Sequence, residues 1–250
     1  MRDFSFELLD CLYFFLMSLC YAFPMGKRGP KPKGKVKIEW SSEFAYAIGL
    51  LATDGCLSSN GRHIIFVSKD IEQIHNFTNC LGINEIKIGK TVSGYDGGWA
   101  HRVQFGDILF YEFLKSIGFS PAKSKTLSKI KIPQEFFFDL LRGCFDGDGC
   151  FYSYWDSRWR SSHMFYVEFI SASRAHIDWL RDELYQRLGV RGHIGKDGRG
   201  SIYQMKYAKK EALEIIKKMY YTPRVVCLTR KRLKIEKALM TESKQQKLYS

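Results

Sequence analysis

The sequence is poor in acidic residues and lacks the ligand patterns of structural metal sites. Its 250 residues hold 26 Asp and Glu against 39 Lys and Arg, a net charge of +13. Its seven cysteines form no CxxC pair, and its six histidines complete no zinc-ligand spacing. A zinc-finger architecture is therefore excluded. The odd, scattered cysteines indicate reduced thiols of an intracellular protein, in the cytoplasm or nucleoid, or in an organelle of a eukaryote.

Long apolar runs are almost absent. The one at residues 12–23 is too short and too interrupted for a transmembrane helix. It also lacks the basic start and the small-residue cleavage site of a signal peptide. We therefore expect no membrane partner. The composition changes at Met25, so we interpret residues 1–24 as an atypical segment from an upstream start, with Met25 as the natural first residue.

The excess of basic residues favours a polyanionic partner, above all nucleic acid. Residues 25–37 form a basic arm in which GKRGPKPKGKVK carries six Lys and Arg and no acid. Its prolines and glycines predict an extended segment. Such an arm could neutralise DNA phosphates or be a plain solvated linker, and both interpretations stay open.

The remainder of the chain is an internal repeat of two similar copies. In each copy an apolar run of helical length ends in an acid before a glycine, and strand-like and helical stretches alternate behind it. The predicted helices lie at residues 44–51, 69–81 and 108–117, and again at 136–145, 173–188 and 210–220. The predicted strands include residues 62–68, 85–92 and 101–105, and again 164–171, 193–195 and 201–207. The sequence therefore predicts an α+β fold of two pseudo-symmetric αββαββα halves, residues 38–132 and 133–240, with a tail at 241–250.

Two nine-residue segments carry the chemistry, AIGLLATDG at residues 47–55 and LRGCFDGDG at residues 141–149. Gly49 and Gly143 hold matching places, where a small residue lets two helix backbones approach closely. Asp54 and Asp148 then close the helices, although a carboxylate at a helix C-terminus is unfavourable with the helix dipole. An ordinary surface acid is the alternative at each position, but an unfavourable choice made twice argues for function.

These segments resemble the two copies of the LAGLIDADG motif, and residues 38 to about 240 resemble a single-chain, two-motif LAGLIDADG homing endonuclease. The resemblance implies curved antiparallel sheets that form a DNA-binding saddle, and a helix interface at Gly49 and Gly143. It implies a monomer that cuts both strands of a long double-stranded DNA site, with Asp54 and Asp148 as catalytic residues.

The resemblance also implies Mg²⁺, or Mn²⁺, as cofactor, held at Asp54, Asp148, Gly55 and Gly149. Two close carboxylates repel each other unless a cation neutralises them, and a hard divalent ion suits both oxygen ligands and phosphate. Bound metal would activate a water and stabilise the leaving oxygen.

The second motif departs from the first at two positions. Asp146 stands where the first motif has Ala52, and we interpret it as a structural acid rather than a metal ligand. Arg142 breaks the apolar pattern, and we expect it on the helix face away from the partner helix.

The family uses basic side chains near the scissile phosphates to stabilise developing charge. Lys123 and Lys125 precede the second motif, and Arg230 and Lys231 hold a comparable place in the second half. The sequence does not separate these four. Lys125 and Lys231 are taken as the catalytic candidates.

Alternate side chains of each sheet would face the major groove. The residues predicted to face DNA in the first half are Arg62, His63, Lys87, Lys90, Arg102 and Gln104. Those predicted in the second half are Tyr154, Arg158, Arg160, Arg191, Lys196, Arg199, Gln204 and Lys206. Residues 152–160 (YSYWDSRWR) mix arginine with aromatic residues and are expected to form a contact loop.

Two other functions stay open. An RNA maturase, which assists intron splicing and binds intron RNA, could keep both acids. A DNA-binding regulator without nuclease activity is disfavoured because both aspartates are present.

Overall fold

The computed structural model describes residues 34–92, 97–158, 163–198 and 200–249. Residues 1–24, most of the basic arm, Arg160 and Arg199 lie outside the described residues. Among those described, no helix combines the length and the apolar character that a membrane span requires.

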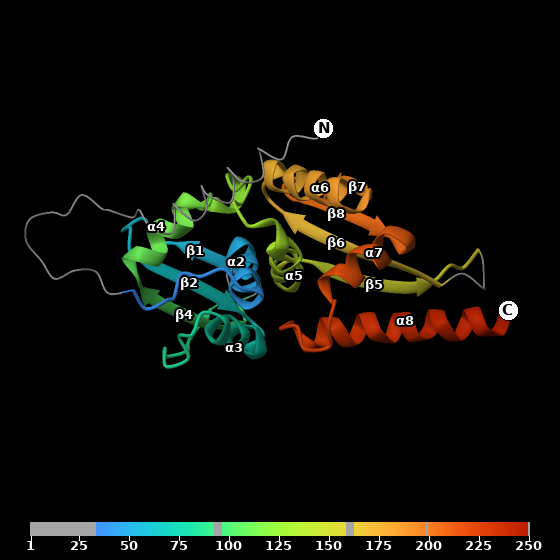
Figure 1. Ribbon diagram of the computed structural model, residues 1–250, viewed down its shortest axis with the longest axis horizontal. Coiled ribbons are helices and arrows are strands. Elements are labelled where there is room, and N and C mark those ends of the chain that lie inside the picture. Colours follow the sequence, from blue (N-terminus) through green and yellow to red (C-terminus); the bar gives the residue numbers. More distant parts are fainter. Residues whose placement is uncertain (1–33, 93–96, 159–162, 199, 250) are drawn as a thin grey trace, which may run out of the picture. The chain divides into compact units, whose positions relative to one another are not determined.

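Each half has the order αββαββα, which confirms the predicted fold class (Figure 1). The first half contains α2 (Ser42–Asp54), β1 (Gly55–Leu57), β2 (His63–Ser68), α3 (Ile71–Cys80), β3 (Gly89–Val92), β4 (Trp99–Gly106) and α4 (Ile108–Ser116). The second contains α5 (Phe137–Gly147), β5 (Cys150–Trp155), β6 (His163–Ser171), α6 (Arg174–Leu188), β7 (His193–Lys196), β8 (Tyr203–Ala208) and α7 (Lys209–Met219). A further helix, α8 (Thr229–Tyr249), follows α7. Short 3₁₀ helices at Lys123–Lys125 and Gln134–Phe136 lie between α4 and α5.

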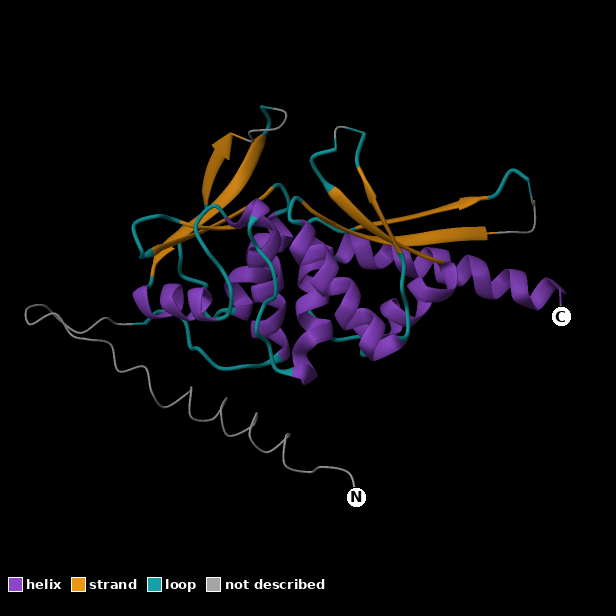
Figure 2. Cartoon of the chain, turned by 90° about the horizontal axis from the view of Figure 1, so that it is seen from above, coloured by secondary structure: helices purple, strands orange, loops and turns teal. Residues whose placement is uncertain are grey.

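The two halves have the same sheet topology. Their sheets are antiparallel, with strand orders β1-β2-β4-β3 and β5-β6-β8-β7. Cys56 pairs with Ile65 in the first sheet, and Cys150 pairs with Glu168 in the second. Each strand that follows a motif helix therefore enters its sheet at the same place. Figure 2 shows both sheets on the same side of the helices.

Local capping sets where the helices begin and end. The Ser41 hydroxyl accepts a hydrogen bond from the Phe44 amide at the start of α2, and Asp107 does the same for Phe110 in α4. Gly82 and Gly189, which directly follow the predicted helices at residues 69–81 and 173–188, adopt φ values of 66° and 69°. Glycine adopts this left-handed conformation without the strain of a Cβ atom.

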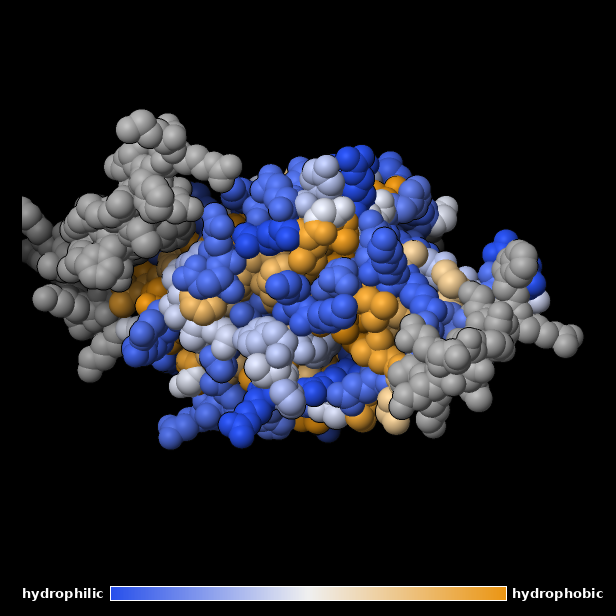
Figure 3. Space-filling model, turned by 45° about the vertical axis from the view of Figure 1, so that its right-hand side comes forward, coloured by the Kyte–Doolittle hydropathy of each residue, from blue (hydrophilic) through white to orange (hydrophobic). Residues whose placement is uncertain are grey.

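Each half has its own hydrophobic core; α2 contributes to the first core, and α5 contributes to both. Every residue of α2 from Phe44 to Ala52 is buried. Such continuous burial is typical of a helix that is covered on all sides. The molecular face seen in Figure 3 is mainly hydrophilic, with smaller apolar patches.

Three features differ from the sequence prediction. Residues 85–88 are not strand, and β3 begins only at Gly89. Much of the predicted contact loop at 152–160 is strand β5, because Tyr152 and Tyr154 both stack on Tyr166 of the neighbouring strand. Helix α8 was not predicted. Its sequence is rich in charged residues, which hide the helical spacing of its buried Ile235 and Ala238.

Candidate active site

The two motif helices touch through their glycines. A Cβ atom on Gly49 would lie 2.2 Å from the Leu140 carbonyl oxygen, and one on Gly143 would lie 2.2 Å from that of Tyr46. Only glycine permits this approach. The contact continues to the helix ends, where a Cβ atom on Gly147 would collide with the Thr53 side chain at 1.9 Å. The structure thus brings the C-terminal ends of α2 and α5 together.

Asp54 and Asp148 follow this contact, at the same end of the helix pair. Burial, and then the negative charge of Asp148, raise the pKa of Asp54 to about 7. Desolvation also raises the pKa of Asp148, while Lys123 and Lys231 lower it. The side-chain amide of Gln73 donates to Asp54 Oδ2 at 3.4 Å. The four charged groups are therefore close enough to act on one another.

A buried lysine caps each motif helix. Lys123 Nζ donates to the carbonyl oxygens of Ala52 and Thr53 at 2.8 and 3.0 Å, at the end of α2. These carbonyls have no partner within the helix, and the negative end of the helix dipole favours a cation. Burial lowers the pKa of Lys123, whereas the charges of Asp148 and Asp54 raise it.

Lys231 has the equivalent place at the end of α5. Its Nζ donates to the carbonyl oxygens of Phe145, Asp146, Gly147 and Gly149 at 2.6, 2.8, 3.2 and 2.7 Å. Burial lowers its pKa to about 8, and the nearby Asp146, Asp54 and Asp148 oppose that shift. The charges of Asp54 and Asp148 thus act on both lysines, which contact the backbone at the two helix ends.

The structure places the four candidate basic residues differently. Lys123 and Lys231 reach the motif helices, while Lys125 is exposed and Arg230 pairs with Asp70 at 2.6 Å. Lys123, which was not selected from the sequence, is therefore the counterpart of Lys231. The choice depends on the 3₁₀ turn entered through Ala122, whose φ of 56° is unusual for a residue with a side chain. No sequence spacing signals that turn.

The donor chemistry of the site fits a hard divalent ion. Within the described ranges, no group of three His, Cys, Asp or Glu side chains is placed to hold a metal. Asp54 and Asp148 would supply two carboxylates, and backbone oxygens, water and substrate phosphate would supply the rest. Mg²⁺ is usually held in this way. Of the two predicted glycine ligands, Gly149 already accepts a hydrogen bond from Lys231, and Gly55 begins β1 directly after Asp54.

Asp146 lies inside the helix interface. Its Oδ2 atom accepts hydrogen bonds from the Tyr46 hydroxyl at 2.8 Å and from the Leu228 amide at 2.7 Å. Complete burial raises its pKa to about 6. These contacts agree with a structural role for Asp146, since it ties α5 both to α2 and to the segment before α8.

The expectation for Arg142 was wrong. Its guanidinium is buried, and it lies 5.5 Å from the ring centroid of Tyr46 on the partner helix α2. It pairs with Asp139 at 2.7 Å and donates to the carbonyl oxygens of Val226 and Met219. A buried charge is tolerated here because its donors have partners.

The register of the sheets divides the residues predicted to face DNA. In the first sheet Arg102 and Gln104 pair with Val67 and Ile65, opposite the buried face that holds Phe66. In the second sheet Tyr154, Gln204 and Lys206 alternate with buried positions in the same way. These five side chains share the sheet faces away from the helices.

The other predicted residues are placed differently. By strand alternation Lys90 and Lys196, which pair with His101 and Tyr203, belong to the opposite faces. Arg191 stacks on Tyr185 of α6 at 4.8 Å. The remaining predicted DNA-facing residues lie at turns and strand ends: Arg62, His63, Lys87 and Arg158.

Sequence reasoning missed one cluster on the outer face of the second sheet. Glu168 pairs with Lys206 at 2.7 Å and accepts a hydrogen bond from the Tyr152 hydroxyl at 3.2 Å. The ammonium group of Lys206 lies 5.3 Å from the ring centroid of Tyr152. The alternation of Tyr152 and Tyr154 was the available signal for this outward face.

No protein-family model matches the sequence, and no curated protein matches it closely enough to count as a relative. Solved structures do match. The meganuclease I-SmaMI bound to uncleaveable DNA has a TM-score of 0.54 at 13% identity, over 84% of this chain and 92% of that chain. The homing endonuclease I-WcaI bound to its DNA recognition sequence has a TM-score of 0.52 at 14% identity, over 80% and 93%.

Full-length DUF199/WhiA from Thermatoga maritima also matches, with a TM-score of 0.52 at 12% identity, over 84% of this chain and 67% of that chain. A second structure of that protein is described as its N-terminal LAGLIDADG domain. Identities this low show a common fold and no more. The chain therefore has the fold that LAGLIDADG homing endonucleases share with the LAGLIDADG domain of DUF199/WhiA.

Proposed function

We propose that this protein is a site-specific endonuclease that cuts both strands of a long double-stranded DNA site in a reaction that depends on a divalent metal ion. One duplicated feature carries the proposal. Asp54 and Asp148 close two helices in glycine contact, and a buried lysine caps each helix beside them. A structural role would not need two carboxylates at this place, because burial and then the charge of Asp148 raise the pKa of Asp54 and disfavour its ionised form.

The residues divide the work between the two strands. Asp54 and Asp148 would hold Mg²⁺ or Mn²⁺ against the DNA phosphates, and each would serve one strand. Such an ion, when bound, activates water for attack and stabilises the leaving oxygen. Lys123 and Lys231 favour the ionised carboxylates, since their charges lower the pKa values of both aspartates. The protein would act as a monomer, because a single chain supplies both centres.

The sheet faces away from the helices would bind the DNA. The net charge of +13 favours contact with phosphates. Arg102, Gln104 and Lys206 lie on those faces, where such side chains can reach base edges in a major groove.

A DNA-binding regulator without nuclease activity is the second candidate. The match to DUF199/WhiA favours it, because the fold is not confined to homing endonucleases among the similar structures. The maturase alternative has no supporting observation in the fold or in the comparisons, and we do not propose it.

Cleavage of a randomised double-stranded DNA library separates the two candidates. With Mg²⁺ the wild type should release double-strand breaks at one sequence, and a chelator should stop the reaction. Asp54→Asn or Asp148→Asn should each abolish the double-strand break and leave DNA binding largely intact. Glu112→Gln, at a partly exposed residue of α4 that pairs with Lys115, is the control and should cut normally. Full cleavage by the double aspartate variant would refute the mechanism, and binding without cleavage by the wild type would favour the regulator.

A further inference from the structure

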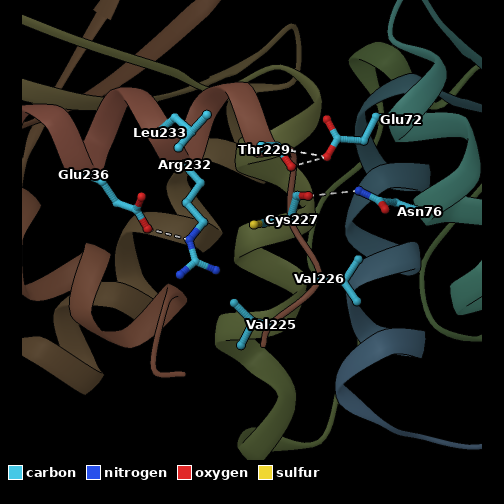
Figure 4. A pocket seen from close by; sticks show the side chains of 9 residues that line it. All are labelled: Glu72, Asn76, Val225, Val226, Cys227, Thr229, Arg232, Leu233 and Glu236. Carbon is cyan, nitrogen blue, oxygen red and sulfur yellow. Dashed lines mark hydrogen bonds and ion pairs between the residues drawn. The ribbon is translucent and has the colours of Figure 1, made fainter. Parts of the chain in front are cut away.

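The segment that leads into α8 is held at successive residues. The Cys227 carbonyl oxygen accepts a hydrogen bond from Asn76 Nδ2 at 3.0 Å, and the Leu228 amide donates to Asp146 at 2.7 Å. The contacts of Asn76 and Glu72 with this segment border a hollow of about 560 Å³ (Figure 4). Asn76 belongs to α3, so the first half holds a segment of the second half.

The next two residues are also bound by the first half. Glu72 accepts hydrogen bonds from the Thr229 amide, at 3.1 Å, and from the Thr229 hydroxyl. Arg230 pairs with Asp70, the residue that precedes α3, at 2.6 Å. Thr229 begins α8, where backbone amides lack helical partners and a carboxylate is favoured. Glu72 therefore caps a helix of the opposite half.

Lys231 comes directly after these anchored residues. Its position along α8 depends on where the helix begins, and its ammonium group reaches the carbonyl oxygens at the end of α5. The contacts of α3 thus determine how Lys231 meets the second motif helix.

Lys123 of the first half is placed by contacts with the second half. Four residues after Lys123, the Leu127 carbonyl oxygen accepts a hydrogen bond from the Ser173 hydroxyl. The carbonyl oxygen of Ser128 accepts one from His176 Nδ1 at 2.8 Å. Ser173 and His176 lie at the start of α6 in the second half, whereas Lys123 caps α2 in the first. The two halves therefore exchange the same kind of support.

We infer that Glu72 of α3 and His176 of α6 are positioning residues, and that each half places the lysine that caps the motif helix of the other half. The two centres are then coupled through crossed contacts: the first half supports the centre with Asp148 and Lys231, and the second half supports the centre with Asp54 and Lys123. The strand-specific consequence rests on the proposed endonuclease function.

The first test measures the nicking of each strand separately, on a plasmid that carries the selected target, with Mg²⁺. Glu72→Ala should slow the strand that depends on Asp148, as identified with Asp148→Asn, by about tenfold, because small displacements near reacting groups have large effects on rate. The KM should change little, since the DNA surface is untouched. His176→Gln should slow the other strand. Glu112→Ala, which removes a carboxylate from the surface of α4, should change neither. Equal slowing of both strands by Glu72→Ala, or no slowing, would overturn the inference.

The second test needs no cleavage. Thermal unfolding midpoints are measured for Glu72→Ala, for Lys231→Met and for the double variant, with Glu112→Ala in place of Glu72→Ala as the control cycle. The shifts should be non-additive for Glu72 with Lys231 and additive for Glu112 with Lys231. Additive shifts in the first cycle would overturn the crossed placement. A non-additive first cycle in a protein that cuts no DNA would uphold it while the endonuclease proposal fails.

Discussion

Lys123 and Lys125 lie two positions apart but in different surroundings. Lys123 is buried against two carbonyl oxygens at the end of α2, and Lys125 is exposed. Lys123→Met should lower the free energy of unfolding by about 1–3 kcal/mol, because it leaves buried acceptors without a donor. Lys125→Met should change it by less than about 0.5 kcal/mol. Urea unfolding of both variants checks the difference, and equal effects would show that the ammonium group does not cap α2.

His176 should make stability depend on pH. Burial lowers its pKa from 6.5 to about 4; the hydrogen bond with Ser128 opposes this shift, and the charge of Lys123 adds to it. Between these two pKa values His176 is protonated in the unfolded chain but neutral in the folded protein. The free energy of unfolding therefore falls as the pH drops from about 6.5 to 4. The difference between the two pKa values corresponds to about 3 kcal/mol.

Unfolding of wild type and His176→Gln at several pH values isolates this contribution. The raised pKa values of Asp54 and Asp146 have the opposite effect on stability. As the pH falls, these carboxylates take up protons in the folded protein before they do so in the unfolded chain, which increases the free energy of unfolding. The quantity to compare is therefore the difference between the two proteins, which should narrow toward low pH. His75→Gln, at an exposed position of α3, serves as the control. A difference that stays constant would contradict the prediction.

The crossing of α2 and α5 depends on glycine in both helices. Gly49→Ala would place its methyl group 2.2 Å from the Leu140 carbonyl oxygen, so backbone rather than a flexible side chain must move. We expect a loss of about 3 kcal/mol or more in the free energy of unfolding, and loss of any cleavage, because the helix ends separate. A Cβ atom on Gly198 would have no other atom within 4 Å, so the control variant Gly198→Ala should unfold like the wild type. Thermal unfolding decides, and a stable Gly49→Ala variant would mean that the helices pack more loosely.

The elements predicted from the sequence were those with local signals. The motif helices were visible as repeated apolar runs, and Gly82 and Gly189 marked helix ends by the φ values that only glycine adopts easily. Helix α8 had no such signal, because its binding to α3 and α5 depends on side chains distant in the sequence. For the same reason the site was predicted only in part. Asp54 and Asp148 were visible in the repeat, whereas the choice of Lys123 over Lys125 depends on tertiary contacts with α2.

Over the whole molecule, DNA binding should depend on the basic charge, whereas cleavage should depend on the two aspartates. The net charge of +13 is spread along the chain, whereas the proposed chemistry depends on two carboxylates. The Asp54→Asn/Asp148→Asn double variant should therefore bind the selected DNA even with a chelator present. Its affinity should fall steeply with salt, by about 10³-fold to 10⁵-fold between roughly 50 and 200 mM if about six to ten phosphates are contacted.

Lys206 offers a sharper measure of the same property. Lys206→Gln should reduce the slope of log affinity against log salt by about one if its ammonium contacts a phosphate. If Lys206 instead reads a base, the slope should stay and the preference among target sequences should relax. Its ion pair with Glu168 and its position over Tyr152 hold the ammonium on the outer sheet face, which favours base reading by a fixed group. Fluorescence anisotropy at several salt concentrations, on matched and single-substitution targets, separates the two outcomes. An unchanged slope with unchanged preference would remove Lys206 from the DNA surface.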